Sequence, residues 1–354
     1  MRRRLQNRIA ESSMLLPVVS VAALLIWLAM GLLSQGMWVE IVLFALSTYL
    51  MAELNTRHAL LRTKSRMVSC SFMLLTLLAI TVTGTPIVGM SQDLGIIALL
   101  MQHGHYSILP ALLSSSITTL TLIILQTATV VCLSLFAGTY QDRQSQGTFF
   151  YISLLISLAS FLWRPFLWLL PLIMLFAITP MRSFSVRALI ASLLGVLLPY
   201  WLLLLWVFTS DIPPTEYSDI LLHHLSAAVS IGWLQGYEFI TDHDLLVYGY
   251  FLILLLLSTM HLISDASKDK MRVRMYYRVF SFMAWIIMLL MPFMPLTTPL
   301  MLPLAALFIS PLVAHAVTFT NSRFSNILFV IFLLLLIALL IINILNIPLF
   351  PVCF

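Results

Sequence analysis

Residues 325–347 read SNILFVIFLLLLIALLIINILNI, an apolar run without one charged side chain. A helix needs about 20 apolar residues to cross a hydrocarbon core of about 30 Å. Backbone that faces lipid must also pair its own polar groups, which a helix achieves within a single segment. The run therefore predicts a membrane-spanning helix, and similar runs recur along the chain on both sides of every polar connection.

Composition extends this interpretation to the whole chain. Hydrophobic residues make up 61% of the 354 positions and charged residues only 9%, whereas about 25% of the residues in a soluble domain are charged. A soluble fold with this composition would expose apolar surface on every side. We therefore predict an all-α fold, a polytopic transmembrane helix bundle in which residues 1–354 form a single membrane domain.

Apolar runs and the charges between them predict about 11 membrane helices. The predicted spans are 14–34, 37–54, 67–84, 108–138, 148–163, 165–180, 188–209, 244–264, 279–294, 296–319 and 325–347. The two runs within 148–180 are short, with arms of roughly 24 Å at 1.5 Å per residue. We expect this pair to form a short or re-entrant hairpin.

Basic residues provide an independent test of this map, because lysine and arginine gather in the cytoplasmic loops of membrane proteins. With the N-terminus in the cytoplasm, 17 of the 18 lysines and arginines lie on the cytoplasmic side, and Arg164 is the exception. If 148–180 were one span, the basic cluster at 268–278 would move outside. The charges therefore favour a hairpin, and they place the C-terminus on the extracytoplasmic side.

Several function classes find no support in the sequence. No phosphate-binding glycine loop or helical metal-binding motif occurs, and the three cysteines, Cys70, Cys132 and Cys353, lack metal-binding spacing. We therefore expect no cofactor and no metal. The basic residues lie in loops beside apolar spans, so the net charge of +5 does not indicate a nucleic-acid partner.

Ionisable groups are rare inside the predicted spans. Glu53 lies beside a basic loop and is expected to form an interfacial salt bridge, whereas His261 and His315 lie near the cytoplasmic ends of their spans. We interpret both histidines as hydrogen-bonded interfacial groups, with a proton relay as the alternative. Three prolines in the span 296–319 leave open a broken helix or ordinary packing: Pro299, Pro303 and Pro311.

Arg164 is the one basic residue predicted outside the cytoplasm, and it lies between Trp163 and Pro165. One interpretation is an anchor in which an aromatic belt and an arginine reach lipid head groups. The other is a clamp, because a guanidinium binds two oxygens of a phosphate at once. The clamp would hold the phosphate of a lipid-linked substrate.

Two extracytoplasmic segments could face Arg164. The first contains Asp93, His103 and His105. The second is the loop 210–243, whose Asp219 and His223 are four residues apart. Ordinary solvated loops are the alternative interpretation of both segments.

The loop 210–243 also contains an amphipathic pattern. In 215–233, apolar residues recur near helical spacing, from Tyr217 to Val229. This pattern predicts an amphipathic interfacial helix on the outer surface of the membrane.

Residues 149–206 include LASFLWRPFLWLLPL, then Arg182, Arg187 and GVLLPYW. This region resembles the middle of multi-pass glycosyltransferases that use polyprenyl-phosphate sugars, and it is equally similar to a group of uncharacterised bacterial multi-pass membrane proteins. The resemblance implies a multi-pass protein of the bacterial cytoplasmic (inner) membrane. Those glycosyltransferases carry a catalytic acidic residue in a long first outer loop. Here that loop is only about 35–37, so Asp93 is the nearest candidate for a general base.

Three functions remain open at this stage: a non-enzymatic component of the bacterial envelope, a divergent lipid-linked-sugar glycosyltransferase, and a carrier for a lipid or a neutral solute. For the glycosyltransferase, the catalytic candidate is Asp93, and the substrate-binding candidates are Arg164, His103, His105, Asp219 and His223. The expected partners are membrane lipids, and beyond them a lipid-linked glycan substrate or other membrane proteins. A cavity shared by Arg164 and Asp93 would favour the enzyme.

Overall fold

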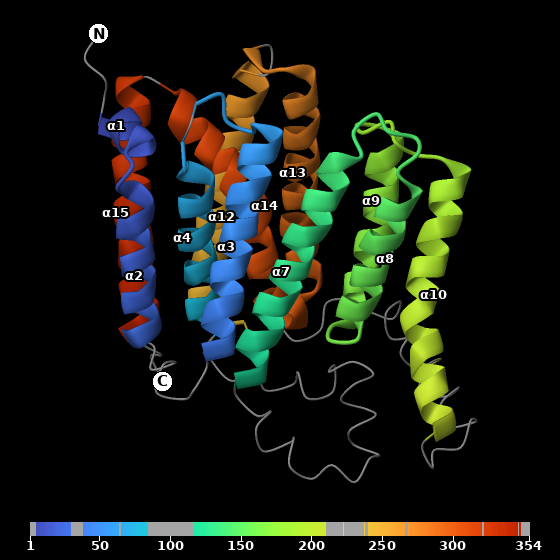
Figure 1. The fold of residues 1–354 in the computed structure, drawn as a ribbon. Helices are drawn as coiled ribbons and strands as arrows, with labels where there is room; N and C mark the ends of the chain where they lie inside the picture. The colour runs from blue at the N-terminus through green and yellow to red at the C-terminus, as the bar shows by residue number, and fades with distance from the viewer. Residues whose placement is uncertain are drawn as a thin grey trace. The chain divides into compact units, whose positions relative to one another are not determined.

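A computed structural model describes residues 5–29, 38–63, 65–83, 116–209, 222, 237, 240–265, 268–320, 322–345 and 347. All regular elements in these ranges are helices (Figure 1), which confirms the predicted all-α bundle. The chain divides into two compact units. One consists of Met1–Pro86 with Leu234–Phe354, and the other of Ile87–Trp233.

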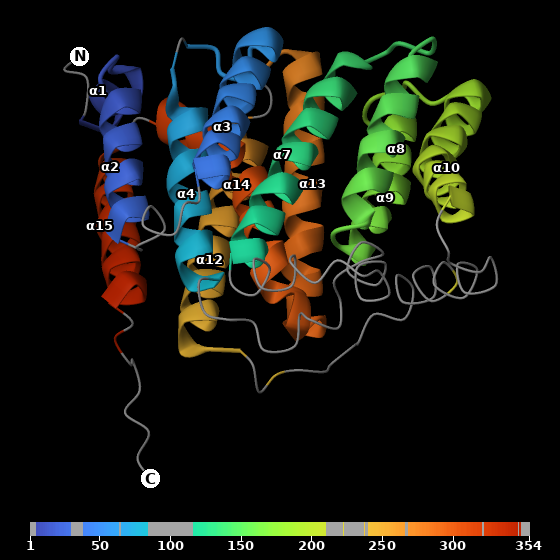
Figure 2. The ribbon, with the colours of Figure 1, turned by 60° about the horizontal axis from the view of Figure 1, so that its bottom comes forward.

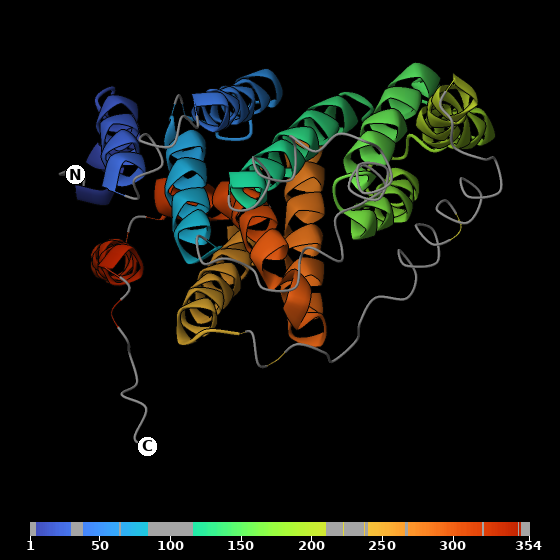
Figure 3. The ribbon, with the colours of Figure 1, turned by 90° about the horizontal axis from the view of Figure 1, so that it is seen from below.

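The first unit is built around one central helix. Its helices are α1 (Leu5–Glu11), α2 (Leu15–Ala29), α3 (Trp38–His58), α4 (Met67–Thr83), α12 (Asp242–Asp265), α13 (Met271–Leu290), α14 (Thr298–Phe319) and α15 (Arg323–Leu345), with the 3-10 turns η6 (Met291–Phe293) and η7 (Pro295–Thr297) before α14. The central helix is α14, which packs against α4, α12 and α13 and lies among them in Figure 3. In the apolar stretch of α14, 83% of the residues are buried inside the structure, whereas the corresponding share in α15 is 17%.

The prolines of α14 do not break it. Pro311 has no N–H to give to the carbonyl four residues earlier, which is that of Leu307. The hydroxyl of Ser310 donates to this carbonyl at 3.0 Å instead. The hydroxyl of Ser71, on α4, donates to the Ser310 carbonyl at 2.9 Å. Side-chain donors thus keep the helix continuous and tie it to α4, so ordinary packing, rather than a broken helix, accounts for the prolines.

The second unit contains α7 (Ser116–Gly138), α8 (Gln146–Ser160), the 3-10 helix η3 (Arg164–Trp168), α9 (Leu169–Ile178) and α10 (Val186–Thr209). The helices α8, α9 and α10 run side by side (Figure 2). The connections 139–145 and 179–185 meet at one end, where the Gln141 N–H donates to the Met181 carbonyl at 3.0 Å. The turn η3 lies at the other end. The chain between 146 and 178 therefore goes out and comes back, which confirms the predicted hairpin and its short arms.

Small residues allow α8 and α10 to approach closely. The hydroxyl of Ser157 donates to the Val196 carbonyl at 2.9 Å. A Cβ atom on Gly195 would lie 2.2 Å from the Ser153 hydroxyl and 2.5 Å from the Phe150 carbonyl oxygen. Such small-residue contacts are how helices associate in lipid, where apolar side chains gain little from leaving the solvent.

Seven helices in the described residues are long and apolar enough to cross a membrane, namely α3, α7, α10, α12, α13, α14 and α15. Four shorter apolar helices accompany them: α2, α4, α8 and the segment Arg164–Ile178. Large apolar side chains are exposed on the outside, as at Leu193, Ile331 and Leu334. The chain is therefore a membrane protein in contact with lipid. The count of 11 crossings and the single domain stay predictions.

A clear difference from the predicted spans is at α13, and one short helix was not predicted. The helix α13 begins at Met271, eight residues before the predicted start at 279, so Arg272 and Arg274 lie on a helix rather than in a loop. Long basic side chains can continue a helix past the apolar run because their heads reach water. The short helix α1 was not predicted, since its seven residues contain too few apolar positions to stand out. The helix predicted within 215–233 lies outside the described residues, apart from Leu222.

Candidate functional site

Arg164 begins η3, at the turn between the two arms of the hairpin. The helix α8 ends at Ser160, and Trp163 is extended, with φ −144° and ψ 108°. Pro165 has no N–H to continue α8 and is well suited to the first turn of the new helix. The turn closes through the Phe166 N–H, which donates to the Trp163 carbonyl at 3.1 Å. The sequence Trp-Arg-Pro-Phe thus directs the chain back on itself and fixes the backbone that carries Arg164.

The Arg164 side chain is buried. The residue is only 4% exposed, and its Nε and Nη2 atoms have no hydrogen-bond partner in the part of the chain that the structure describes. The flanking Trp163 and Phe166 are also buried, with ring centroids 6.5 Å apart. Removing a charge from water is unfavourable unless a partner compensates it. Such a guanidinium therefore calls for an anion.

The described part of the second unit does not supply that anion. Asp142 is the one carboxylic acid between residues 116 and 209, and it lies in the connection before α8, whereas Arg164 follows the far end of that helix. A helix of 15 residues separates the two ends by about 22 Å. An ion pair between Asp142 and Arg164 is therefore excluded by distance.

The other predicted site residues cannot be placed beside Arg164. They are Asp93, His103, His105, Asp219 and His223, and all five lie outside the described residues. The expected cavity that joins Arg164 to Asp93 therefore stays a prediction.

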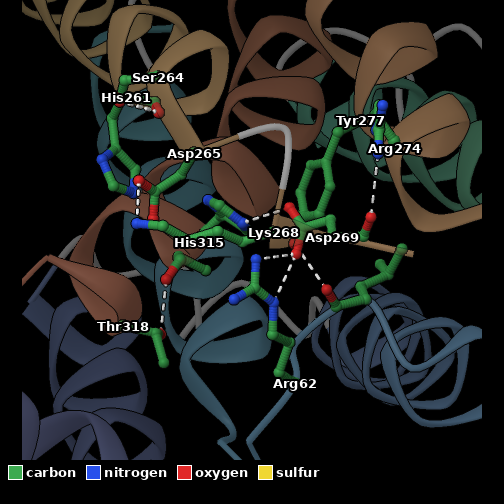
Figure 4. A network of polar contacts seen from close by, with 12 residues as sticks. Arg62, His261, Ser264, Asp265, Lys268, Asp269, Arg274, Tyr277, His315 and Thr318 are labelled. Atoms are coloured by element: carbon green, nitrogen blue, oxygen red, sulfur yellow. Dashed lines mark hydrogen bonds and ion pairs between the residues drawn. The ribbon is translucent and has the colours of Figure 1, made fainter. Parts of the chain in front are cut away.

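A second polar cluster lies at one end of the first unit, which we call the basic end. It is the end that carries the α3–α4, α12–α13 and α14–α15 connections. Asp269, between α12 and α13, lies at its centre (Figure 4). Its Oδ1 accepts a hydrogen bond from Arg62 Nε at 2.7 Å and forms an ion pair with Arg62 Nη2 at 2.6 Å. Its Oδ2 lies 3.1 Å from Nε2 of His315. A single carboxylate thus joins the α3–α4 connection to the central helix.

Two of the three side chains in this cluster are almost completely buried. The side chains of Asp269 and His315 are 2% and 1% exposed, whereas that of Arg62 is 38% exposed. The guanidinium of Arg62 also lies over the Phe319 ring, 5.0 Å from its centroid. The acid is therefore shielded, and its basic partner lies between it and the solvent.

Aromatic rings enclose His315. The ring centroids of Tyr277 and Phe319 lie 4.8 and 4.7 Å from that of His315, and the centroid of His261 lies 5.5 Å away. Nε2 of His315 faces the Asp269 carboxylate, so Nδ1 is the ring nitrogen left for a further partner. This Nδ1 is buried without a hydrogen-bond partner in the described residues, as is Nε2 of His261.

Sequence reasoning identified the two histidines but missed Asp269. A lone acid within the run from Lys268 to Arg274 has the pattern of a solvated loop. Its partners lie 207 and 46 residues away in the chain, and no local pattern could indicate them. No group of three histidine, cysteine or acidic residues in the described ranges could hold a metal ion.

Comparisons with known proteins add no identity to these sites. The chain matches no protein-family model, no curated protein and no solved structure.

Proposed function

We propose that this chain is a bacterial envelope protein of the inner membrane that binds the phosphate of a membrane amphiphile through Arg164. The observation that carries the proposal is a guanidinium 4% exposed, with Nε and Nη2 unpaired in the described residues. A buried cation of this kind in a membrane protein is a mark of a binding site. Phosphate is the anion that membrane amphiphiles offer most commonly.

The geometry of the two unpaired atoms supports a bidentate ligand. In a guanidinium, the Nε and Nη2 donors point along one edge, and they match two oxygens of the same phosphate or carboxylate. The Arg62–Asp269 pair uses this same edge, although there both nitrogens contact the single oxygen Oδ1. The aromatic side chains of Trp163 and Phe166 beside Arg164 would exclude water and favour the apolar part of the ligand.

A lipid-linked sugar is the substrate class that fits both this site and the resemblance of residues 149–206 to glycosyltransferases that use polyprenyl-phosphate sugars. In that reading, Asp93 acts as general base, with His103, His105, Asp219 and His223 as further substrate contacts. A non-enzymatic envelope component would bind the phosphate without turnover. A carrier would move the amphiphile across the membrane. Release of a sugar from a polyprenyl-phosphate sugar separates the enzyme from the other two.

Replacing Arg164 with glutamine should weaken binding of a polyprenyl phosphate by at least about tenfold, because charge-assisted hydrogen bonds contribute about 1.5–3 kcal/mol. Arg164→Lys retains the charge but loses the paired Nε and Nη2 donors, so an intermediate affinity is expected. Binding is measured on the purified protein in lipid nanodiscs, with the uncharged polyprenol as the comparison ligand.

The matched control is Arg187→Gln, which alters an exposed arginine on α10 and should leave the affinity unchanged. Equal affinity of wild type and Arg164→Gln, or equal binding of polyprenol and its phosphate, would overturn the proposal. A phosphatidylglycerol affinity equal to that for polyprenyl phosphate would instead assign Arg164 to ordinary phospholipid.

The orientation in the membrane belongs to the same proposal, and cysteine labelling tests it. Cys70 and Cys132 are buried, so they should stay unlabelled in the folded protein. With Cys353 replaced by serine, the chain provides a background for single cysteines at exposed positions.

Four exposed positions test both units: Gln144, Ser322, Trp168 and Phe293. A membrane-impermeant maleimide added to intact spheroplasts should label cysteine at 168 and 293, and cysteine at 144 and 322 only after permeabilisation. The reverse pattern in either unit would show that the unit is inserted the other way round.

A further inference from the structure

The first unit contains a cavity of about 310 Å³ between α1, α4, α12, α14 and α15. We call this cavity the α15 slot. Pockets for small ligands run from about 300 to 1,000 Å³, so the slot has room for one narrow apolar chain rather than for a whole two-chain lipid. The slot belongs to the first unit, whereas Arg164 belongs to the second, and the slot takes no part in the function proposed above.

The slot is polar at one end and apolar along the rest. At the basic end its lining includes Gln6, His261 and Ser325, and further along it includes Phe332 and Leu336. On α15 the lining residues extend from 324 to 336, a rise of about 18 Å. The slot therefore has the polarity and length of an amphiphile with its head at the basic end.

Polar contacts tie α15 to the rest of the unit at both ends of the slot, and within its lining the Tyr250 hydroxyl donates to the Phe332 carbonyl at 3.2 Å. At the basic end, the Ser325 hydroxyl donates to the Gln6 side-chain oxygen at 3.0 Å. At the opposite end, the Asn343 side-chain amide donates to the Thr81 hydroxyl at 3.3 Å. In lipid no hydrophobic force closes such a gap, so the slot is a stable feature of the bundle.

The slot opens to the lipid beside α15. Leu333, which lines the apolar part of the slot, is 38% exposed. A chain from the surrounding bilayer can therefore enter sideways, without passing through the polar end.

Charge at the slot's polar end identifies the kind of head group. Arg323 is exposed, lies between the lining residues Ser322 and Phe324, and forms no ion pair in the described residues. The acids nearby are already engaged. Asp265 pairs with Lys268 at 2.8 Å, and Asp269 pairs with Arg62 at 2.6 Å. Positive charge thus remains uncompensated at this end.

His261 adds a hydrogen-bonding group at the same place. It lines the slot, and its Nε2 has no hydrogen-bond partner in the described part of the chain. We propose that the α15 slot binds one acyl chain of an anionic phospholipid, whose phosphate lies at the basic end near Arg323 and His261.

Native mass spectrometry of the full chain tests the proposal, with phosphatidylglycerol and phosphatidylcholine of identical acyl chains as probes. The wild type is expected to retain one phosphatidylglycerol in preference to phosphatidylcholine by about fivefold, the contribution of one basic residue near an anionic lipid. Arg323→Gln should abolish this preference. Arg278→Gln, an exposed arginine on α13, should keep it.

A second pair of variants tests the slot itself. Leu328→Trp fills the slot and is expected to reduce lipid retention at least about tenfold, because the chain loses its buried methylene groups. Leu334→Trp adds the same ring to the lipid-facing side of α15, where Leu334 is exposed and outside the slot lining, and should retain the lipid.

Two outcomes would overturn the proposal. One is equal retention of the two phospholipids by the wild type. The other is equal retention by the two tryptophan variants. Arg323→Gln alters an exposed side chain and should fold normally. The comparison of phosphatidylglycerol with phosphatidylcholine therefore still tests the proposal if Leu328→Trp does not fold.

Discussion

Asp269→Asn is expected to lower the free energy of unfolding by about 3 kcal/mol, the lower end of the range of about 3–5 kcal/mol for losing one partner of a buried ion pair. The Asp269 side chain is 2% exposed and contacts both Arg62 and His315. Asparagine would leave the Arg62 guanidinium without its counter-charge. Arg62 can turn partly towards solvent, which is why the lower end applies. The loss is measured by reversible unfolding in detergent–lipid mixed micelles.

Asp265→Asn is the matched control for this prediction. Asp265 lies four residues earlier at the same end of the unit, and its partner Lys268 is 61% exposed. Exposed pairs contribute about 0–1 kcal/mol, so this variant should stay within about 0.5 kcal/mol of wild type. The double variant Arg62→Gln with Asp269→Asn should lose less than the sum of the single losses. Equal losses for Asp265→Asn and Asp269→Asn would contradict the role assigned to Asp269.

Gly195→Ala should destabilise the second unit by about 1–3 kcal/mol, the usual effect of adding volume to a well-packed contact. The new Cβ would meet the Phe150 carbonyl oxygen at 2.5 Å and the Ser153 hydroxyl at 2.2 Å. The serine can rotate, but a backbone carbonyl cannot move aside without shifting α8. The helices α8 and α10 must therefore separate, which also weakens the Ser157–Val196 hydrogen bond.

Gly249→Ala provides the comparison. Gly249 lies on α12, and no atom lies within 4 Å of the Cβ that alanine would add. Alanine is also the better helix former, by about 1 kcal/mol. Thermal unfolding in detergent should therefore rank Gly249→Ala at or above wild type and Gly195→Ala clearly below it. A Gly195→Ala variant as stable as wild type would mean that the two helices pack less closely than described.

Hydropathy and charge predicted the framework of the fold because lipid imposes a strict rule on each segment separately. The helix α15, 323–345, lies within two residues of its predicted span at each end. The hairpin followed from counting basic residues, since a single span at 148–180 would have placed the cluster of five at 268–278 outside. Both inferences need only the composition along the chain and no contact between distant residues.

The polar sites required three-dimensional information. The site at Asp269 joins residues 62, 269 and 315, and membrane hydropathy says nothing about which loops meet. The burial of Arg164 likewise depends on how α8 ends and α9 begins. Sequence reasoning identified Arg164 because it broke the charge rule. It could not distinguish an exposed anchor from a buried cation, and the structure favours the buried cation.

The short hairpin has a mechanical consequence for the bilayer. An arm of 15 residues, such as α8, rises about 22 Å, about 8 Å less than a hydrocarbon core of about 30 Å. Hydrophobic mismatch of this kind is relieved by local thinning of the bilayer. The thinned leaflet would bring its phosphate layer down to the depth of Arg164. The membrane itself would then deliver head groups to the turn, and the length of α8 would set how far the leaflet must deform.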